Sequence, residues 1–368
     1  MKIINLQDKN LFYVGGVVRD ELLGAESFDV DLTYVGDAIE YAKSIPEAQI
    51  VQINEPFGTV RIKLGSEEID IASTRSETYP QKGHLPVIKE IGCPLKEDIL
   101  RRDFTINAMA KSTLTGEIVD YSGGLADIKD KVLRVLYDES FIDDPTRIVR
   151  ALKFAVRFGF ELEPKTRLLR DNYLKNINYD ISYKRLKKEL VETFNLNSGK
   201  AFDIFVNEGL YKLVSPETFE LPKINFEQLI KMYCPENIWI IYIGILPDIS
   251  SLPLTKTEKK IVDDFKALKN CENLASADDF EICKTFESVN LESIIMYSSV
   301  NNDIVEKYLN KLRHVQIEIT GKDLIELGIS PSSKYQQCFD FILKQKLKNP
   351  ELTKVQEINL AKQFFEII

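Results

Sequence analysis

The sequence predicts an α+β fold, in which a mixed α/β N-terminal part with a β-sheet is followed by an all-α remainder. Up to about residue 137, short runs of β-forming residues are interleaved with helical segments. From about residue 138, apolar residues recur at helical spacing. A chain of 368 residues, 44% of them hydrophobic, has enough apolar material for roughly two to four domains.

The N-terminal part opens with a strand–helix–strand pattern. "LFYVGG" (residues 11–16) predicts a strand that ends in a turn, and "VVRDELLG" (17–24) predicts a short amphipathic helix. "FDVDLTYVG" (28–36) predicts a second strand. "FGTVRIKLG" (57–65) and "EEIDIAST" (67–74) alternate apolar with polar residues around a glycine turn, so they predict a hairpin.

The rest of this part is less regular. Three prolines and two glycines in residues 75–100 predict a long, mobile loop. "RRDFTINAMA" (101–110) is expected to open a helix, and a second hairpin-like stretch runs as far as "YSGG" (121–124).

The helical remainder begins with "DDPTRIVRALKFAVRF" (143–158), where Pro145 stands in the first turn, a position that tolerates proline. "ISYKRLKKELVETF" (181–194) continues the helical pattern. The longest apolar run, "IWIIYIGIL" (238–246), is too short to cross a bilayer and predicts a buried helix.

Charge is unevenly distributed along the chain. The net charge is −9, yet residues 101–200 carry 19 Lys and Arg against 15 Asp and Glu. A basic middle in an acidic chain fits a local phosphate-binding face, and it also fits ordinary helix surfaces.

The cysteines and histidines exclude some metal sites. Five scattered cysteines, never in a C-x-x-C pair, predict reduced thiols, a cytoplasmic protein and no zinc knuckle. Two histidines exclude a His-rich metal site. The N-terminus lacks the apolar core of a signal peptide, and no membrane association is expected.

Two acidic residues interrupt the strand 28–36. Asp29 and Asp31 are two apart, so their side chains lie on one face of the strand, where like charges repel. Asp70, on a later strand, would join them if the strands are neighbours. Three such carboxylates need cations, and Mg²⁺ takes oxygen ligands from few carboxylates plus substrate phosphates. Two ions would clamp the attacking and leaving oxygens of an in-line displacement. An exposed strand position remains the alternative for Asp70.

Two further segments carry the marks of a phosphate site. Gly15 and Gly16, between a strand and a helix, let the backbone approach a phosphate, and Arg19 follows one turn later. A tight turn that requires glycine is the alternative. In "RRDFTINA", Arg101 and Arg102 at a helix start would oppose the helix dipole unless a triphosphate lies nearby. Asp103 and Asn107 belong to this cluster, where Asp103 is alternatively a cap or an ion-pair partner.

Together these segments resemble a known family, the class II (bacterial-type) CCA-adding tRNA nucleotidyltransferases, with their bacterial poly(A) polymerase relatives. Residues 11–190 carry the resemblance densely and residues 319–331 again, whereas residues 215–310 show nothing similar. The matching motifs, in order, are "GGVVRDELLG…DVDL", "RRDFTINAMA", "DYSGGLADIKDKVLRV", "DDPTRIVRALKFAVRFGF", "ISYKRLKKEL" and, in the tail, "ITGKDLIELGISP".

The resemblance implies a nucleotidyltransferase head at 1–137, a helical neck for nucleobase reading and RNA binding at 138–200, a helical body at 201–310 and a tRNA-binding tail at 311–368. It implies template-independent addition of C, C and A to the 3′ end of tRNA from CTP and ATP, with release of pyrophosphate and two Mg²⁺ ions. The expected partners are the tRNA acceptor arm and nucleoside triphosphates, with no obligate protein partner.

The resemblance also assigns residues. Asp29 and Asp31 are the expected metal ligands, with Asp70 as a third catalytic carboxylate. The expected nucleotide-binding residues are Gly15, Gly16, Arg19, Arg102, Asp103, Asn107, Asp144, Arg147, Arg150 and Lys153. The expected RNA-binding residues are Lys184, Arg185, Lys187 and Lys188.

The chain departs from the family pattern at three places. Asp143 stands where the base-reading motif usually has Glu, and Lys153 stands where a further Arg is usual, which loses a bidentate fork. Pro331-Ser332-Ser333 replaces the usual P-G-P of the tail.

The residues of the fourth motif support base reading independently. Asp144, Arg147, Arg150 and Lys153 recur every three residues and form a stripe along one helix face. C and A both present a ring-nitrogen acceptor beside an amine donor, and an Arg donor beside an Asp acceptor matches that edge. A solvated charged stripe is the alternative.

Several functions remain open beside CCA addition. Within the same chemistry stand an A-adding enzyme, a CC-adding enzyme, which by resemblance would have the 75–100 loop shortened, and a poly(A) polymerase, expected to carry a basic C-terminal extension. A non-catalytic RNA-binding protein on this scaffold is disfavoured, because unpaired carboxylates are costly to retain. A small-molecule nucleotidyltransferase would not need so many helices after its head.

Overall fold

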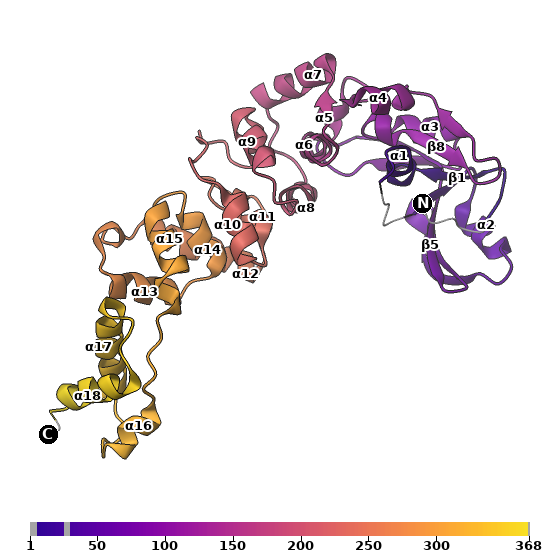
Figure 1. The fold of residues 1–368 in the computed structure, drawn as a ribbon. Coiled ribbons are helices and arrows are strands. Elements are labelled where there is room, and N and C mark those ends of the chain that lie inside the picture. Colours follow the sequence, from indigo (N-terminus) through magenta and orange to yellow (C-terminus); the bar gives the residue numbers. More distant parts are fainter. Residues whose placement is uncertain (1–5, 26–29, 367–368) are drawn as a thin grey trace. The chain divides into compact units, whose positions relative to one another are not determined.

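A computed structural model of the chain describes residues 6–25 and 30–366. The chain forms two compact units. Unit 1 comprises Met1–Phe219 and Ser250–Pro253, and unit 2 comprises Glu220–Ile249 and Leu254–Ile368. The predicted α+β fold is confirmed, since strands and helices of the N-terminal part are followed by a helical remainder (Figure 1). The finer division into four domains stays a prediction.

The main sheet of unit 1 has seven strands in the order β3-β4-β5-β2-β1-β8-β9. All neighbours are antiparallel except β2 and β5, which are parallel. The strands are β1 (Leu11–Val14), β2 (Asp31–Tyr34), β3 (Gln49–Asn54), β4 (Thr59–Leu64), β5 (Glu67–Ser73), β8 (Met109–Ser112) and β9 (Ile118–Asp120). The predicted hairpins are therefore present as β4–β5 and β8–β9.

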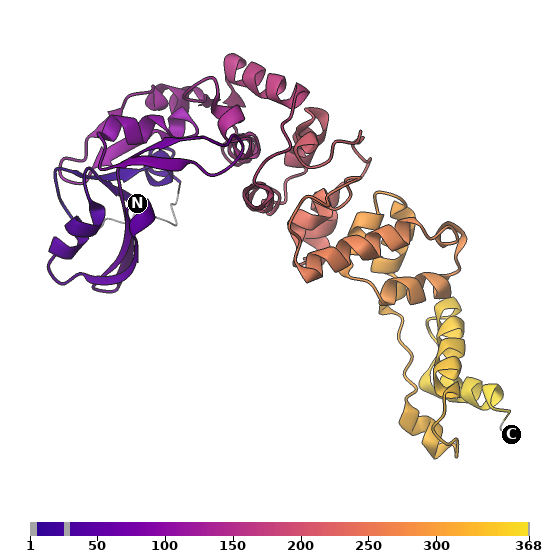
Figure 2. The ribbon, with the colours of Figure 1, turned by 180° about the vertical axis from the view of Figure 1, so that it is seen from behind.

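The helices of the head lie among these strands (Figures 1 and 2). They are α1 (Gly16–Leu22), α2 (Ala38–Ser44), α3 (Leu95–Leu100) and α4 (Gly124–Asp130). Asp37 caps the N-terminus of α2, where its carboxylate accepts hydrogen bonds from the backbone N–H groups of Ile39 and Glu40. It packs on β4 and β5.

The prediction of a long, mobile loop at residues 75–100 is wrong. Strands β6 (Arg75–Thr78) and β7 (Val87–Ile91) form an antiparallel hairpin, and α3 follows it. Prolines 80 and 94 lie outside the paired strands, where they break no ladder hydrogen bond. The turn of this hairpin is joined to a later segment of unit 1, because the N–H of Gly83 donates to the carbonyl of Asp143 at 3.0 Å.

The prediction that residues 101–110 open a helix is also wrong. A short 3-10 turn at Thr105–Asn107 leads into strand β8. Arg101 and Arg102 therefore follow the C-terminal end of α3, where the helix dipole favours cations, and do not oppose it.

The helical part of unit 1 is built around α6. Its helices are α5 (Ser140–Asp143), α6 (Thr146–Phe158), α7 (Pro164–Lys175), α8 (Tyr183–Phe194) and α9 (Gly199–Asn207), with the short parallel strands β10 (Val132–Leu133) and β11 (Glu161–Leu162). Pro145 caps α6, and Gly159 ends it with φ +69°, a left-handed conformation that favours glycine. The buried face of α6 packs on α8 and α9.

Unit 2 is helical in its described residues. Its helices are α10 (Phe226–Tyr233), α11 (Ile238–Ile243), α12 (Lys256–Lys269), α13 (Asp279–Glu287), α14 (Leu291–Tyr297), α15 (Asn302–Asn310), α16 (Gly321–Glu326), α17 (Lys334–Lys348) and α18 (Lys354–Phe364). The buried helix expected at 238–246 is α11. In residues 6–25 and 30–366, no helix is long and apolar enough to cross a membrane.

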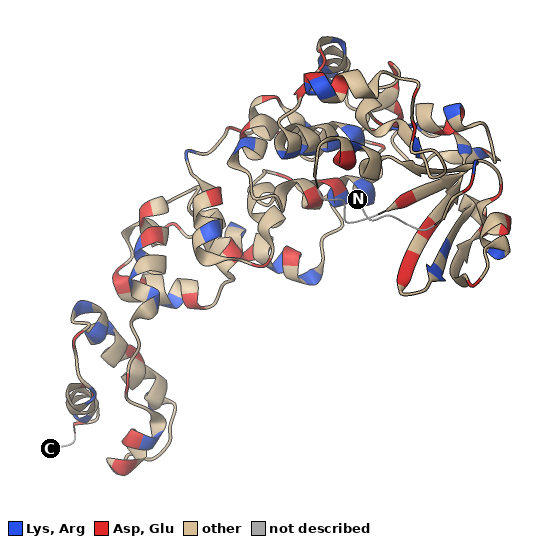
Figure 3. Ribbon diagram, turned by 45° about the vertical axis from the view of Figure 1, so that its right-hand side comes forward, with Lys and Arg blue, Asp and Glu red and all other residues tan. Residues whose placement is uncertain are grey.

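The C-terminal helices share a small core of their own, formed by Ile319, Leu324, Cys338, Ile342 and Ala361. Beside it the fully buried Glu357 accepts hydrogen bonds from the N–H groups of Glu318 and Ile319 and pairs with Lys346 at 2.5 Å. These contacts satisfy a buried carboxylate, which would otherwise destabilise the tail. Charged positions of both signs are spread over the elements of each unit (Figure 3).

Candidate functional site

A cavity of about 950 Å³ in unit 1 collects the predicted nucleotide-binding residues. All ten of them line it, together with Asp31. The lining includes nine cations and six carboxylates, namely Arg19, Arg75, Arg101, Arg102, Arg147, Arg150, Lys153, Arg157, Arg185, Asp31, Glu77, Asp103, Asp144, Glu189 and Glu192. The cavity therefore carries a net positive lining inside an acidic chain, which suits an anionic ligand.

The Gly15-Gly16 turn forms one part of the lining. Gly15 has φ +69° and ψ −128°, and a Cβ placed there would lie 2.8 Å from Nη1 of Arg102. The turn therefore needs glycine both for its backbone conformation and for the close approach of Arg102.

Arg102 keeps an unused hydrogen-bond donor. Its Nη2 donates to Asp98 at 3.2 Å, while its Nε is buried and has no hydrogen-bond partner among the described residues. A buried donor without a partner costs stability unless a ligand accepts its hydrogen bond. Arg102 also lines the cavity, where its guanidinium is suited to an anion.

Two neighbouring arginines are held by shared carboxylates. Arg101 pairs with Glu77 at 3.0 Å and with Asp98 at 2.7 Å, and Arg75 pairs with Glu77 at 2.7 Å. Three arginines, Arg102 included, therefore share two buried carboxylates, which leaves one positive charge in excess at this end of the cavity.

The predicted acidic cluster is described only in part. Asp29 lies outside the described residues. Strands β2 and β5 are neighbours, as the acidic cluster requires, and Asp31 stands opposite Asp70 in the parallel register. Yet Asp70 forms a bidentate ion pair with Arg61, both distances 2.8 Å, and does not line the cavity. Within residues 6–25 and 30–366 no group of three or more His, Cys, Asp or Glu side chains is arranged to hold a metal.

Asp144 lies at the start of α6 with both carboxylate oxygens engaged. Oδ1 accepts from the N–H of Thr146 at 3.2 Å and from its hydroxyl at 2.6 Å. Oδ2 accepts from Nη2 of Arg185. The carboxylate is 4% exposed and so holds one orientation at the cavity wall.

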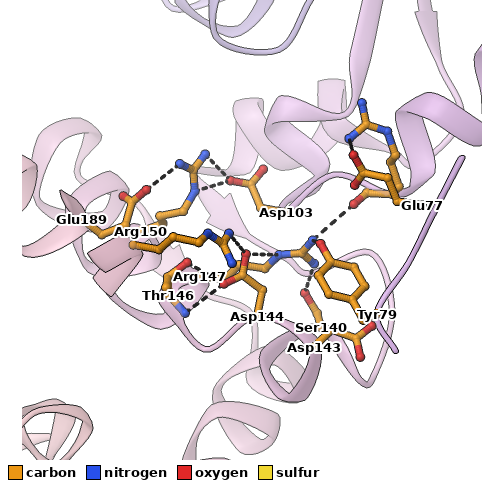
Figure 4. A network of polar contacts seen from close by, with 12 residues as sticks. Glu77, Tyr79, Asp103, Ser140, Asp143, Asp144, Thr146, Arg147, Arg150 and Glu189 are labelled. Atoms are coloured by element: carbon orange, nitrogen blue, oxygen red, sulfur yellow. Dashed lines mark hydrogen bonds and ion pairs between the residues drawn. The ribbon is translucent and has the colours of Figure 1, made fainter. Parts of the chain in front are cut away.

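Arg147 is held by more hydrogen bonds than Asp144 (Figure 4). Its Nη1 donates to Ser140 Oγ at 2.6 Å and to Tyr137 Oη at 3.2 Å. Its Nη2 donates to Tyr79 Oη at 3.1 Å and to the carbonyl of Arg101 at 3.2 Å. All four terminal N–H groups thus have protein partners, and Nε lies 3.9 Å from Asp144. Burial acts to lower the pKa of Arg147, but Tyr79, Tyr137 and Asp144 together keep it above its ordinary value.

Asp103, Arg150, Glu189 and Lys153 form a chain of ion pairs from the head to α8. Asp103 accepts from Nε of Arg150 at 2.8 Å, and Nη1 of Arg150 donates to Glu189 at 3.0 Å. Lys153 pairs with Glu189 at 2.8 Å. Burial acts to raise the pKa of Asp103, but Arg150 and the hydrogen bond from Asn107 outweigh burial and hold that pKa well below its ordinary range.

The four predicted RNA-binding residues lie at two different sites on unit 1. Lys184, Lys187 and Lys188 lie on one side of α8 and line a second cavity of about 470 Å³ with Pro253. Nζ of Lys187 donates to the carbonyl of Pro253 at 3.0 Å. Arg185 instead lines the main cavity, where it contacts Asp144 and the carbonyl of His84.

The sequence reasoning missed part of the lining. Tyr79 and Arg75 come from the β6–β7 hairpin, which was expected to be a loop, so nothing placed them near α6. Asp143, the departure from the family pattern, points away from the main cavity: it pairs with Lys82 and accepts from Tyr137 Oη at 3.0 Å. The hydrogen bond from Arg147 Nη2 to Tyr79 Oη, at 3.1 Å, places the hairpin beside α6.

Known proteins resemble this chain over nearly its whole length. Residues 11–134 match the Poly A polymerase head domain. An A-adding tRNA nucleotidyltransferase of Halalkalibacterium halodurans is 31% identical over 97% of this chain and 89% of its own length. A second, from Aquifex aeolicus, is 49% identical over 43% of this chain, and this alignment spans 20% of that longer relative.

Solved structures agree with the sequence comparison. The CCA-adding enzyme of Thermotoga maritima complexed with tRNA-CCA superposes with a TM-score of 0.78 at 25% identity, covering 96% of this chain and 91% of that one. Because a relative above 30% identity aligns with almost all of this chain, and the fold agrees throughout, the chain belongs to the tRNA nucleotidyltransferase family.

Proposed function

We propose that this protein adds nucleotides to the 3′ end of tRNA without a nucleic-acid template, using nucleoside triphosphates and releasing pyrophosphate. One observation carries the proposal: a single cavity of about 950 Å³ holds an arginine with an unused donor at one end and the Asp144–Arg147 pair of α6 in its wall. The relatives named above are tRNA nucleotidyltransferases, and one is complexed with tRNA.

Arg102 and the Gly15-Gly16 turn are the proposed triphosphate contacts. Arg102 lines the cavity, where its guanidinium would pair with a phosphate oxygen, and the turn keeps its backbone close to that guanidinium. Arg75 and Arg101 add positive charge near Arg102, and Glu77 and Asp98 compensate part of that charge. The tRNA 3′-hydroxyl would attack the α-phosphorus, with pyrophosphate as the leaving group.

Asp31 is the proposed Mg²⁺ ligand among the described residues, and Asp29, two residues earlier in the sequence, is its proposed partner. A carboxylate oxygen at the wall of a phosphate-binding cavity is the donor type that Mg²⁺ takes. Two bound ions would supply charge neutralisation at the phosphates and a more acidic 3′-hydroxyl. Asp70 is held by Arg61, so any part it plays as a third carboxylate requires that ion pair to open.

Asp144 and Arg147 are the proposed base-reading residues. Asp144 would accept from the exocyclic amine of C or A, and Arg147 would donate to the ring nitrogen beside it. Since all four terminal N–H groups of Arg147 are engaged, a base must displace one partner or use Nε. Tyr79 is the partner that comes from the hairpin.

The proposed product is the complete C, C, A end, as in the CCA-adding structure. Addition of the terminal A alone is the second candidate, because both sequence relatives described above are A-adding enzymes. Asp144 and Arg147 match the shared edge of both C and A, so this pair by itself does not distinguish the two candidates.

Incubation with three tRNAs, which end at the discriminator base, at C and at CC, tests these products. Each tRNA is given CTP, ATP or both, with Mg²⁺. Extension of all three to CCA supports the first candidate. Extension of only the CC-ending tRNA, by one A, supports the second. No incorporation into any tRNA would refute the proposed activity.

A further inference from the structure

Arg19 of α1 is buried among groups from two different parts of unit 1. Its Nε and Nη2 both donate to Oδ1 of Asp20, at 2.8 and 2.6 Å, and its Nη1 donates to Asn107 at 2.6 Å. The residue is 5% exposed. Three of its donor atoms are thus committed to side chains of the head.

The guanidinium also touches α6. Its Cζ lies 5.0 Å from the ring centroid of Phe154 and 4.8 Å from that of Phe158. Arg157 adds a second link, since its Nη2 lies 3.9 Å from Asp20 and its Cζ lies 4.9 Å from the Phe158 ring. A buried cation against two rings is a favourable contact.

Arg19 differs from Arg102 in what it can offer a phosphate. Asp20, at 2.6 Å, compensates the charge of Arg19. Burial lowers the pKa of Arg19, and this effect outweighs the ion pair with Asp20, which acts to raise it. Arg102 retains a buried donor without a partner. Electrostatics therefore favour Arg102 as the phosphate contact and leave Arg19 to hold protein groups together.

We propose that Arg19 is a positioning residue that fixes α6 against the head, through Asp20 and Asn107 on one side and Phe154 and Phe158 on the other. The proposal rests on the proposed function, because the proposed phosphate contacts of the cavity belong to the head and the proposed base-reading residues lie at α6. Gly15-Gly16 immediately precede α1, and Asp144 and Arg147 stand at the start of α6. A loosened contact would misalign the base with its readers while the phosphates stay bound.

Two variants test the contact. Arg19→Lys keeps the charge but loses the fork and the planar face. Phe158→Leu removes a ring that does not line the cavity. Phe158→Tyr is the matched control, because it keeps a ring for the cation. Phe158→Met replaces the leucine variant if the latter does not fold.

The measured quantity is the ratio of kcat/KM for ATP to that for UTP. Arg19→Lys and Phe158→Leu should each lower this ratio by about twofold to thirtyfold, the equivalent of one cation–π contact, while Phe158→Tyr retains it. The KM for ATP should change less than kcat. An unchanged ratio in Phe158→Leu, with an equal rise of KM for all triphosphates in Arg19→Lys, would overturn the proposal and make Arg19 a phosphate ligand.

A second measurement needs no activity. The fold-change of the unfolding equilibrium constant in urea in the double variant Arg19→Lys, Phe158→Leu should differ from the product of the two single fold-changes, because the two groups are in contact. Additive effects would refute the contact. If the wild-type chain adds no nucleotide to tRNA, the proposed function fails, and the urea measurement alone decides the positioning role of Arg19.

Discussion

At the scale of single residues, Asp144 and Arg147 differ in how tightly their partners hold them. Asp144 shares its carboxylate among Thr146 and Arg185, whereas Arg147 has every terminal N–H engaged. Asp144, the acceptor, is thus fixed by Thr146 of α6 and Arg185 of α8. Arg147, the donor, is fixed by Ser140 of α5 and Tyr79 of the hairpin. Each can be tested separately.

Replacing Asp144 with Ala should relax base selection. The variant loses the acceptor for the amine of C or A and no longer repels the carbonyl of U or G, so selectivity should fall by a factor of about 5 to 150. Single-nucleotide addition to tRNA with each of the four triphosphates measures it. Asp138→Ala is the matched control, because its exposed carboxylate pairs with Lys165 and lies outside the cavity lining. Equal losses for all four nucleotides would mean that Asp144 serves only the structure.

Replacing Tyr79 with Phe should strengthen nucleotide binding. The change removes the acceptor of one Arg147 N–H, which then becomes available to a base. One neutral hydrogen bond contributes about 0.5–1.5 kcal/mol, so the Kd of ATP or CTP should fall by about twofold to twelvefold. Equilibrium binding of ATP measures it. An increase in Kd would show that Tyr79 orients Arg147 rather than competing for it.

Replacing Asp31 with Ala should abolish incorporation of every nucleotide while tRNA binding survives. A metal ligand acts on the chemical step, and RNA is held mainly by cationic side chains. Asp70→Asn is the informative companion: loss of activity would support a third catalytic carboxylate, and retained activity would leave it as the ion-pair partner of Arg61. Activity of Asp31→Ala above a few per cent at saturating Mg²⁺ would contradict its place as a ligand.

At the scale of elements, α6 and α8 are joined to the head by Asp103, Arg150 and Glu189. The pKa of Asp103 lies well below its ordinary value, since Arg150 and Asn107 outweigh the effect of burial. A carboxyl with a depressed folded pKa stabilises the folded state above its unfolded pKa of about 3.9 and loses that contribution as pH falls from there. The ion pairs therefore make this junction sensitive to acid.

Unfolding in urea should show this sensitivity directly. The free energy of unfolding of the wild type should decline as pH falls below about 4, and Asp103→Asn should be less stable at pH 7 but decline less on acidification. Lys165→Ala is a matched control for loss of one ion pair, because its pair with Asp138 is exposed and contributes little. Parallel pH profiles of the wild type and Asp103→Asn would contradict the assignment.

At the scale of the whole molecule, a net charge of −9 is unfavourable for binding a polyanion, so the position of basic residues decides RNA binding. Lys184, Lys187 and Lys188 gather on α8 beside Pro253, which belongs to unit 1 although it stands in the middle of the sequence of unit 2. These three lysines stay the predicted tRNA contacts.

Replacing all three lysines with Ala should weaken tRNA binding and flatten its dependence on salt. Each lost phosphate contact lowers the slope of log K against log salt by about 0.7–0.9. Titration of tRNA at several salt concentrations measures the slope. A variant of three exposed lysines elsewhere in unit 1, Lys43, Lys129 and Lys165, is the control. An unchanged slope would make the α8 lysines an ordinary solvated surface.

The sequence by itself determined the fold class, strands β1, β2, β4 and β5, and ten of the residues that line the cavity. Alternation with period two predicted β4 and β5, and helical spacing predicted α6, because both patterns are local. The glycine pair and the arginine cluster consist of neighbouring residues, and the stripe Asp144, Arg147, Arg150 and Lys153 recurs every three residues, so each pattern is local in the sequence. All ten predicted nucleotide-binding residues accordingly line one cavity.

Only the tertiary structure decided which partner each side chain takes. Residues 75–100 carry turn-forming prolines and glycines, yet strand pairing and contacts with the neck make them a hairpin that delivers Tyr79 to Arg147. Arg19 and Arg102 look alike in sequence, but one is satisfied by Asp20 and two rings and the other keeps an unpaired donor. Such differences arise from contacts between residues far apart in the chain, whose free energies depend on burial and geometry that no local pattern encodes.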